Sequence, residues 1–311
     1  ETKLTDYHLI SMLKIAWSEV YKYNLPEGHR FPMEKYELLP EQLIYEGTVA
    51  EDAFFQPDQL TKEEILLTHH LDYLNKLESL SLTRKEERNT GFPVRKELVE
   101  RGKFISKGTY LCAINSIKYG VSLNIAGGTH HAFPDRGEGF CLFNDIAIAT
   151  KLLLKRNIRS RILIVDLDVH QGNGNAFIFR DNPQVFTFSM HGAKNYPLRK
   201  ETSSLDIGLP DGISDQPYLK LLTDRLPAII DLHKPDIIFY QSGVDILSCD
   251  KLGRLSISID GCKKRDTYVF EQARKNSIPI VAVMGGGYSH KLSHIIEAHA
   301  NTFRQAQSIF F

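Results

Sequence analysis

The chain of 311 residues carries 38 basic and 38 acidic side chains, so no net charge draws it to nucleic acid or to an anionic membrane. Hydrophobic residues make up 42% and charged residues 24%, which excludes a disordered chain and suffices for a large core. No apolar run approaches the roughly 20 residues that cross a bilayer. The 4 cysteines lie far apart, so we expect no disulfide framework and no Cys-ligated zinc, and a cytoplasmic location fits best.

The amino-terminal part of the chain is expected to be mainly helical. Residues 1–11 precede Met12 and an apolar run, and are expected to be a leader or an extension. A strand is expected over residues 13–20, then a loop rich in Pro and Gly, and a second short apolar segment over residues 51–55. From there to about residue 120, apolar residues recur at helical spacing.

The remainder of the chain alternates strands and helices. Short continuous apolar runs predict buried strands over residues 121–125, 162–167, 185–190, 237–240 and 278–283. Helices are expected near residues 145–155, 216–233, 261–275 and 290–306. This order predicts an α/β fold with a mostly parallel central sheet and helices on both faces. Because no repeat or low-complexity linker interrupts it, we expect one domain over residues 12–311.

Acidic side chains and a histidine follow two of these strands. Asp166, Asp168 and His170 occupy alternate positions at one strand end, so their side chains project together. Two carboxylates beside one imidazole repel unless a cation neutralises them, and these ligands suit a divalent ion such as Zn²⁺. A hydrogen-bonded strand end is the alternative. Asp245 follows another strand, where it could equally be an N-cap or a turn former.

Two further strand ends carry a histidine pair and a tyrosine. His130 and His131 follow two glycines, and Tyr288 follows three. Glycines let the backbone approach a ligand closely, whereas a phosphate loop would need a following Lys-Ser or Lys-Thr or the dinucleotide fingerprint. Ligands of open α/β sheets gather at the carboxyl ends of strands, so these residues are candidates for acid/base and electrophilic roles beside a metal. Three protein ligands would leave zinc an open position for water, whose pKa falls towards about 7.

Four motifs resemble the histone deacetylase family of zinc amidohydrolases, in its order and approximate spacing. They are GGTHHA at residues 127–132, GFCLFND at 139–145, DLDVHQGNG at 166–174 and GGGY at 285–288. The resemblance runs from about Met12 to the C-terminus and implies an arginase/deacetylase-like fold with a sheet of about eight strands. Residues 25–31 and 170–174 look most similar to the class IV branch and its bacterial relatives.

The resemblance implies a role for each motif residue. One catalytic Zn²⁺ would be bound by Asp168, His170 and Asp245. His131 would be the general base on the attacking water and then the acid to the departing amine, with His130 as its electrostatic neighbour, paired with Asp166. Tyr288 would donate a hydrogen bond to the tetrahedral oxyanion, an interaction typically worth ~3 kcal/mol.

The resemblance also implies further ions, a channel and substrates. A structural K⁺ or Na⁺ would lie near Asp166, Asp168, His170, Ser189 and Met190. A second monovalent ion would lie near Phe179, Asn182 and Val185. The acyl-lysine channel would be lined by Gly139, Phe140, Gly286 and Tyr196. Implied substrates are an acylated lysine of a peptide or protein, or an acetylated amine.

One position departs from many members of that family. Asn173 stands where they place an aspartate beside the second histidine. An amide orients imidazole without stabilising its positive charge. We therefore expect His131 to be less basic than in relatives that carry the aspartate.

Other functions are weighed against deacylation. An arginase-like dinuclear manganese hydrolase would need a carboxylate at position 172, which is Gly. Loss of Tyr288 or of a metal ligand would favour a non-catalytic binding paralogue, and neither is lost. An acetylpolyamine deacetylase would have an acidic entrance, and a long-chain deacylase would have a deep apolar channel.

Overall fold

Residues 13–311, the part of the chain that this computed structural model describes, are organised around one parallel sheet. Within this part, eight strands pair in the order β2-β1-β3-β8-β7-β4-β5-β6, and each of these seven pairings is parallel. The strands are β1 Lys14–Ala16, β2 Phe54–Phe55, β3 Val121–Asn124, β4 Ile162–Asp166, β5 Val185–Gly192, β6 Leu205–Leu209, β7 Ile237–Gln241 and β8 Ile280–Val283. The expected α/β fold is confirmed, and the expected leader, residues 1–11, lies outside the described residues.

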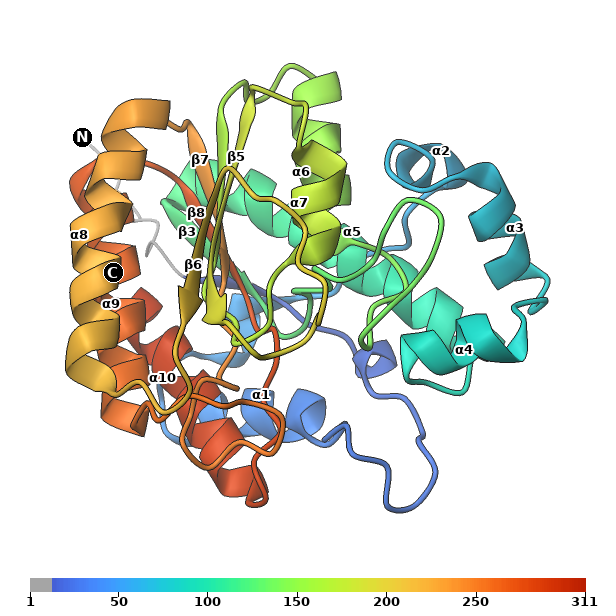
Figure 1. Cartoon of the computed structure of the whole chain (residues 1–311), viewed down its shortest axis with the longest axis horizontal. Helices are drawn as coiled ribbons and strands as arrows, with labels where there is room; N and C mark the ends of the chain where they lie inside the picture. The colour runs from blue at the N-terminus through green and yellow to red at the C-terminus, as the bar shows by residue number, and fades with distance from the viewer. Residues whose placement is uncertain (1–12) are drawn as a thin grey trace, which may run out of the picture.

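Helices cover both faces of the sheet. Figure 1 shows α8, α9 and α10 on one side and α5, α6 and α7 on the other. The helices of the described residues are α1 Lys35–Tyr45, α2 Lys62–Ile65, α3 Leu71–Glu78, α4 Arg84–Thr90, α5 Lys96–Tyr119, α6 Asp145–Lys155, α7 Asn173–Phe179, α8 Asp215–His233, α9 Ile259–Lys275 and α10 Leu292–Phe310. The sheet is therefore the middle layer of three.

The central strands explain why the motif residues meet. Every residue of β3, β4, β7 and β8 is buried, as continuous apolar runs covered on both faces should be. Asp166 at the end of β4 lies opposite Gln241 of β7, and Val283 of β8 lies opposite Gln241 and opposite Asn124 of β3. The loops that follow these strands therefore leave the sheet at one edge.

A buried arginine of α9 ties two of these loops together. Arg265 is 0% exposed and donates to the carbonyl oxygens of Leu167, Ser242 and Gly243 at 3.3, 3.1 and 2.6 Å. Its charge is balanced by the buried carboxylate of Asp266 at 2.8 Å. Removing one partner of such a buried pair is strongly destabilising, because the other charge would remain buried alone.

The first predicted strand is wrong in length. It was expected over residues 13–20, but β1 ends at Ala16. The hydroxyl of Ser18 accepts a hydrogen bond from the backbone N–H of Val20 and so starts a short 3-10 helix at Glu19–Tyr21. A cap of this kind is local and interrupts the apolar run. Helices α1 and α7 and strand β6 were also not predicted.

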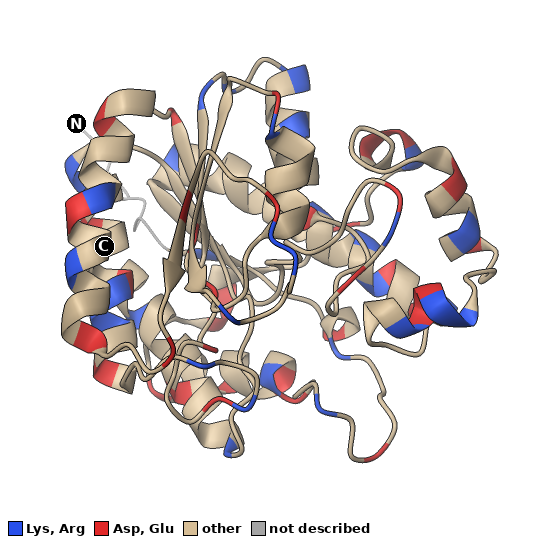
Figure 2. Ribbon diagram, viewed as in Figure 1, with Lys and Arg blue, Asp and Glu red and all other residues tan. Residues whose placement is uncertain are grey.

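Charged side chains are interspersed over the outer surfaces of the helices. Figure 2 shows both signs along α4 and α8, in keeping with the equal totals of 38 basic and 38 acidic residues. Among residues 13–311, no helix combines the length and the apolar character that a membrane crossing requires.

Candidate active site

Two aspartates and a histidine form a buried cluster at the carboxyl edge of the sheet. Asp168 and His170 follow β4, and Asp245 follows β7. The Nδ1 atom of His170 lies 3.1 Å from Asp168 Oδ1 and 3.1 Å from Asp245 Oδ2. One candidate ligand atom from each residue lies within 4.8 Å of the others. The sequence prediction that these three residues converge is confirmed.

Backbone N–H groups hold the two carboxylates in place. The N–H of Gly286 donates to Asp168 Oδ2 at 2.8 Å, and the N–H of His170 donates to Asp168 Oδ1 at 3.0 Å. The N–H of Val169 donates to Asp245 Oδ1 at 2.9 Å. A Cβ atom at position 286 would overlap the Asp245 carboxylate, so the close approach of this loop requires glycine.

The electrostatics of the cluster call for a cation. Burial opposes a charge on His170, but hydrogen bonds and charge from Asp168 and Asp245 outweigh it and raise its pKa to about 10. Burial and the neighbouring Asp168 raise the pKa of Asp245. Two buried carboxylates thus retain a proton unless a metal ion replaces it. Two oxygen donors and one nitrogen donor suit a divalent ion, and the residues present therefore fit Zn²⁺.

The two histidines of the GGTHHA motif lie side by side with different partners. Their ring centroids are 4.1 Å apart. His130 Nδ1 lies 2.6 Å from Asp166 Oδ2, and His131 Nδ1 lies 2.6 Å from Asn173 Oδ1. Because an amide oxygen only accepts hydrogen bonds, His131 carries its hydrogen on Nδ1 and keeps a free lone pair on Nε2.

The same surroundings separate the pKa values of the histidines. Burial lowers the pKa of His131 far below its usual value, and the charges of His130 and His170 add to this effect. Burial also opposes protonation of His130, but Asp166 and Asp168 outweigh it and raise its pKa. A neutral imidazole therefore lies beside a more basic one.

Tyr288 reaches the cluster from the loop after β8. Its backbone N–H donates to Asp250 Oδ2 at 2.6 Å, and its ring packs against Phe31 and Phe140 with centroids 6.0 and 5.7 Å apart. Burial, and then the nearby carboxylates, raise the pKa of its hydroxyl far above the usual value. The hydroxyl therefore stays protonated and can donate a hydrogen bond.

Asp145 holds the loop that carries the histidine pair. This first residue of α6 is 0% exposed. It accepts hydrogen bonds from the N–H groups of Gly128 and Thr129 at 3.1 and 2.7 Å and from the Thr129 hydroxyl at 2.6 Å. The helix start and the loop after β3 are thereby fixed to each other.

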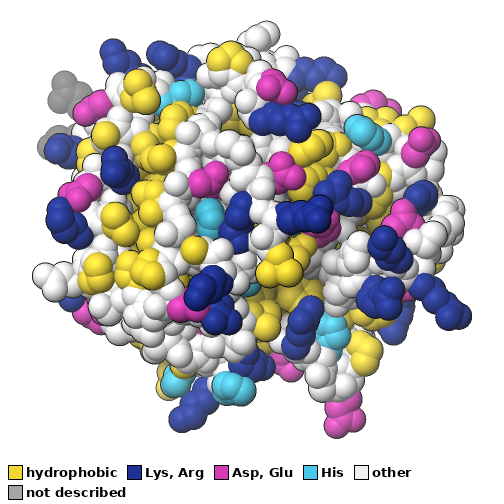
Figure 3. Space-filling view, in the orientation of Figure 1, with side chains coloured by type: hydrophobic (Ala, Val, Ile, Leu, Met, Phe, Trp, Pro, Cys, Tyr) yellow, Lys and Arg dark blue, Asp and Glu magenta, His cyan; other side chains and the backbone are white. Residues whose placement is uncertain are grey.

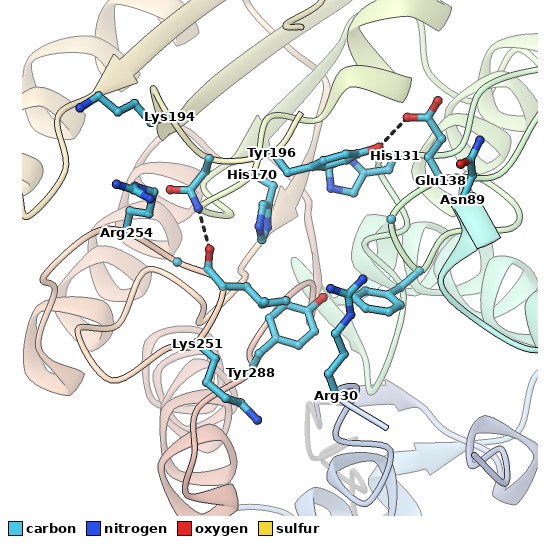
Figure 4. Close-up of a pocket in the computed structure, with 15 residues that line it drawn as sticks. Arg30, Asn89, His131, Glu138, His170, Lys194, Tyr196, Lys251, Arg254 and Tyr288 are labelled. Carbon is cyan, nitrogen blue, oxygen red and sulfur yellow. Dashed lines mark hydrogen bonds between the residues drawn. The ribbon is translucent and has the colours of Figure 1, made fainter. Parts of the chain in front are cut away.

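A cavity of about 670 Å³ opens above the cluster. Figure 4 shows His131, His170 and Tyr288 among the residues that line it. The expected channel residues Gly139, Phe140 and Tyr196 also line it. The ring of Tyr196 lies edge-on to His131 with centroids 5.0 Å apart.

The fourth expected channel residue lies deeper. Gly286 lines a smaller cavity of about 40 Å³, which shares Gly139, Phe140, His131, His170 and Tyr288 with the outer one. Asp168 and Arg101 also line this inner cavity. Of the candidate metal ligands, His170 thus lines both cavities and Asp168 lines the inner one.

The expected monovalent sites fall at two places along β5. Asp166 lies opposite Ser189 across β4 and β5, and Met190 follows directly. The residues of the second site run from the last residue of α7 to the first of β5, and there the N–H of Asn182 donates to the Phe179 carbonyl and that of Val185 to the Asn182 carbonyl. Each expected set is brought together, and ion binding there stays a prediction.

Several residues of the site were not predicted from the sequence. Asp250, which holds Tyr288, lies in a loop without a motif. The outer cavity is also lined by charged side chains of separate loops, namely Arg30, Glu138, Lys194, Lys251 and Arg254. No spacing in the sequence connects these positions, so only the folded chain identifies them.

The fold and the site together define an α/β protein in which a buried Asp-His-Asp cluster that could hold a metal ion lies beside a histidine pair. A family model described as the histone deacetylase domain matches residues 29–303. An uncharacterized protein of Picosynechococcus sp. is 41% identical over 296 residues, which cover 95% of this chain and 99% of that protein. Histone deacetylase 2 of Arabidopsis thaliana is 30% identical over 307 residues, covering 92% of this chain and 77% of that protein.

Solved structures agree in fold over almost the whole chain. The crystal structure of an HDAC homolog complexed with SAHA has a TM-score of 0.82 and 27% identity, and that of an HDAC homolog from Aquifex aeolicus has a TM-score of 0.82 and 25% identity. Each match covers 96% of this chain and 84% of the other. The chain belongs to the histone deacetylase family.

Proposed function

We propose that this protein is a zinc-dependent deacylase that hydrolyses the amide of an acetylated lysine side chain or a related acetylated amine. The observation that carries the proposal is that His131 and Tyr288 line one cavity together with Asp168 and His170, which form a buried cluster with Asp245. When bound, Zn²⁺ would polarise the amide carbonyl and lower the pKa of water.

The side chains around the cluster supply the proton transfers. The His131 imidazole is neutral because burial lowers its pKa. Its Nε2 accepts a proton from the attacking water and then passes a proton to the amine nitrogen as the C–N bond breaks. Asn173 holds the ring in the tautomer that this requires. Tyr288 donates a hydrogen bond to the carbonyl oxygen as negative charge develops on it. The products are a carboxylate and a free amine.

The two cavities favour a short acyl group. A lysine attached to a peptide has to enter from the outer cavity, so the acyl group points to the inner space of about 40 Å³. A space of that size suits an acetyl group better than a long chain. We therefore place acetyl ahead of longer acyl groups as the preferred substituent.

A single catalytic ion is part of the proposal. A dinuclear site would require a carboxylate at position 172, and a Cβ atom there would overlap the Asp166 carboxylate. The buried side chain of Asp166 thus occupies the space that the extra ligand would need. This supports a mononuclear site over the arginase-like alternative.

We propose four finer assignments on the motifs. Residues 12–311 form one catalytic domain, and the protein acts in the cytoplasm. The resemblance of residues 25–31 and 170–174 assigns it to the class IV branch. A K⁺ or Na⁺ near Asp166 and Ser189 stabilises the strand end that carries the zinc ligands. Titrating K⁺ against thermal stability and activity tests this ion.

A hydrolysis assay tests the function. The zinc-loaded protein should release the fluorophore from an acetyl-lysine fluorogenic peptide, a chelator should abolish release, and Zn²⁺ should restore it. His131→Ala should remove activity and leave zinc content unchanged. Binding of the peptide without hydrolysis by the zinc-loaded protein would instead identify a non-catalytic paralogue.

A further inference from the structure

The entrance of the outer cavity is positively charged. Its basic rim consists of four exposed side chains, Arg30, Lys194, Lys251 and Arg254. They come from the loop before α1, the loop after β5 and the loop after β7. Figure 4 shows them around the opening. Figure 3 shows Lys and Arg side chains, with Asp and Glu among them, on the face of the molecule that Figure 1 presents.

The nearby carboxylates do not balance this charge. Glu138, the one carboxylate that lines the outer cavity, pairs with Arg136 at 2.7 Å and accepts the Tyr196 hydroxyl at 2.7 Å. Asp211 is shared by two rim cations, Arg254 at 2.7 Å and Lys194 at 3.7 Å. Two of the four rim cations, Arg254 and Lys194, thus share one carboxylate, so their charge is only partly balanced.

Among residues 13–311, no carboxylate forms an ion pair with the other two members of the basic rim. Within residues 13–311, neither Arg30 nor Lys251 forms an ion pair, and Arg30 lies over the ring of Phe140 at 5.0 Å. Their cationic groups face solvent at the opening that the substrate must pass. Anions are attracted there, and cations are repelled.

We infer that the preferred substrate is an acetyl-lysine in an acidic peptide segment, an inference that rests on the proposed deacylase function. The acetyl-lysine side chain is neutral, so the charge that the basic rim meets is that of the flanking residues. Flanking Asp or Glu would lie against the rim while the acetylated side chain enters the cavity. An acetylated polyamine keeps its remaining ammonium groups, and these would meet like charge. A polyamine deacetylase is expected to have an acidic entrance, whereas the rim of this cavity is basic.

Exposed charges act mainly before the chemical step. At 0.1 M ionic strength the Debye length is about 10 Å, so an exposed rim still attracts a charged peptide, and salt weakens the attraction. Such steering changes association and KM more than the rate of bond cleavage. Selectivity for charge should therefore be found in kcat/KM and should decline with salt.

Matched substrates test the inference. Three acetyl-lysine peptides of equal length, flanked by Glu, by Gly and Ser, or by Lys, are compared with an acetylated polyamine at about 20 mM and about 300 mM salt. We expect kcat/KM for the Glu peptide to exceed that for the Lys peptide by about tenfold at low salt, with kcat nearly constant and the ratio reduced at high salt. Equal values, or a preference for the Lys peptide or the polyamine, would overturn the inference and leave the deacylase function standing.

Charge reversal locates the effect. The double variant Arg30→Glu with Lys251→Glu should reverse the preference between Glu and Lys peptides, measured as the ratio of their kcat/KM values. Lys263→Glu, an exposed position on α9 away from the cavity, is the matched control and should keep the preference of the parent. If the double variant also keeps the preference of the parent protein for the Glu peptide, the basic rim is not the source of that preference. If no substrate is hydrolysed by the parent protein, the deacylase function itself fails, and the inference fails with it.

Discussion

The buried floor and the exposed rim of one cavity are built in different ways. The floor, Asp168, His170, Asp245, His131 and Tyr288, follows the central strands and is at least nine-tenths buried. The basic rim comes from loops and faces solvent. A buried charge needs a partner at a fixed distance, whereas an exposed charge acts through a screened field. The floor is therefore suited to chemistry, and the rim is suited to choice of substrate.

The largest effect should follow from a change of one metal ligand. Asp245→Asn keeps the size of the side chain but removes a negative donor, so zinc content should fall and kcat/KM should decrease by more than about 10³-fold. Metal analysis of the purified variant and the peptide assay measure both. The rim variants should retain zinc, and a fully loaded, fully active Asp245→Asn protein would show that Asp245 is no ligand.

The next largest effect should come from the tyrosine of the floor. Tyr288→Phe removes the donor to the developing oxyanion, so kcat should decrease about 10²- to 10³-fold with little change in KM. Steady-state kinetics of the zinc-loaded variant measure the two constants separately. Tyr45→Phe is the control, because Tyr45 is 90% exposed. A rise in KM alone would instead assign Tyr288 to substrate binding.

A smaller effect should alter the pH profile of the floor. Asn173→Asp places a carboxylate beside His131 Nδ1, where the amide oxygen now lies at 2.6 Å. The carboxylate stabilises the imidazolium and raises the pKa of His131. Because the base must be neutral, the acidic limb of kcat/KM should move to higher pH by about one unit.

The pH profile of zinc-loaded parent and variant, measured with the neutral peptide, tests this shift. Asn157→Asp on the surface should leave the limb in place. An unchanged limb in Asn173→Asp would contradict the expectation that the amide makes His131 less basic.

The smallest effect concerns the scaffold under the floor. His69 is 2% exposed; its Nδ1 donates to the Phe133 carbonyl and its Nε2 accepts from the Asn144 N–H, each at 3.0 Å. Both bonds require the neutral ring, and burial lowers its pKa to about 3. From about pH 6.5 down to about 3 the unfolded chain binds a proton that the folded chain does not, so stability falls as pH falls.

Urea unfolding between about pH 7.5 and 5 measures this contribution. The free energy of unfolding of His69→Gln should depend less on pH than that of the parent, by at most about 1.4 kcal/mol per pH unit below pH 6.5. His70→Gln, an exposed neighbour, should behave like the parent. Parallel pH curves for parent and His69→Gln would contradict the assignment.

The floor could be predicted from the sequence because strand ends are local signals. Asp168 and His170 come directly after a continuous apolar run, and parallel strands bring Asp245 to the same edge. The sheet and most of the helices after residue 120 were predicted for the same reason. The role of each floor residue was predicted from the resemblance to a family, because the strand pattern alone assigns no roles.

The rim could not be predicted, because its side chains are adjacent only in the folded chain. Arg30 and Lys251 are separated by more than two-thirds of the sequence, and exposed positions show no apolar periodicity. β6 was missed because only Leu209 of its residues is buried. α1 was missed because Pro40 lies within it, and proline is a weak indicator of a helix interior.

Asp250 links the buried floor of the cavity to its exposed rim by hydrogen bonds. One of its carboxylate oxygens accepts the N–H of Tyr288, and the other accepts the N–H groups of Leu252 and Gly253 in the loop that also carries Lys251. The backbone of this loop is thus clamped to the oxyanion donor, while the side chain of Lys251 is free to vary. Exchange of rim side chains can therefore change substrate preference without moving Tyr288. An insertion in this loop would displace Tyr288 and so change the rate of bond cleavage.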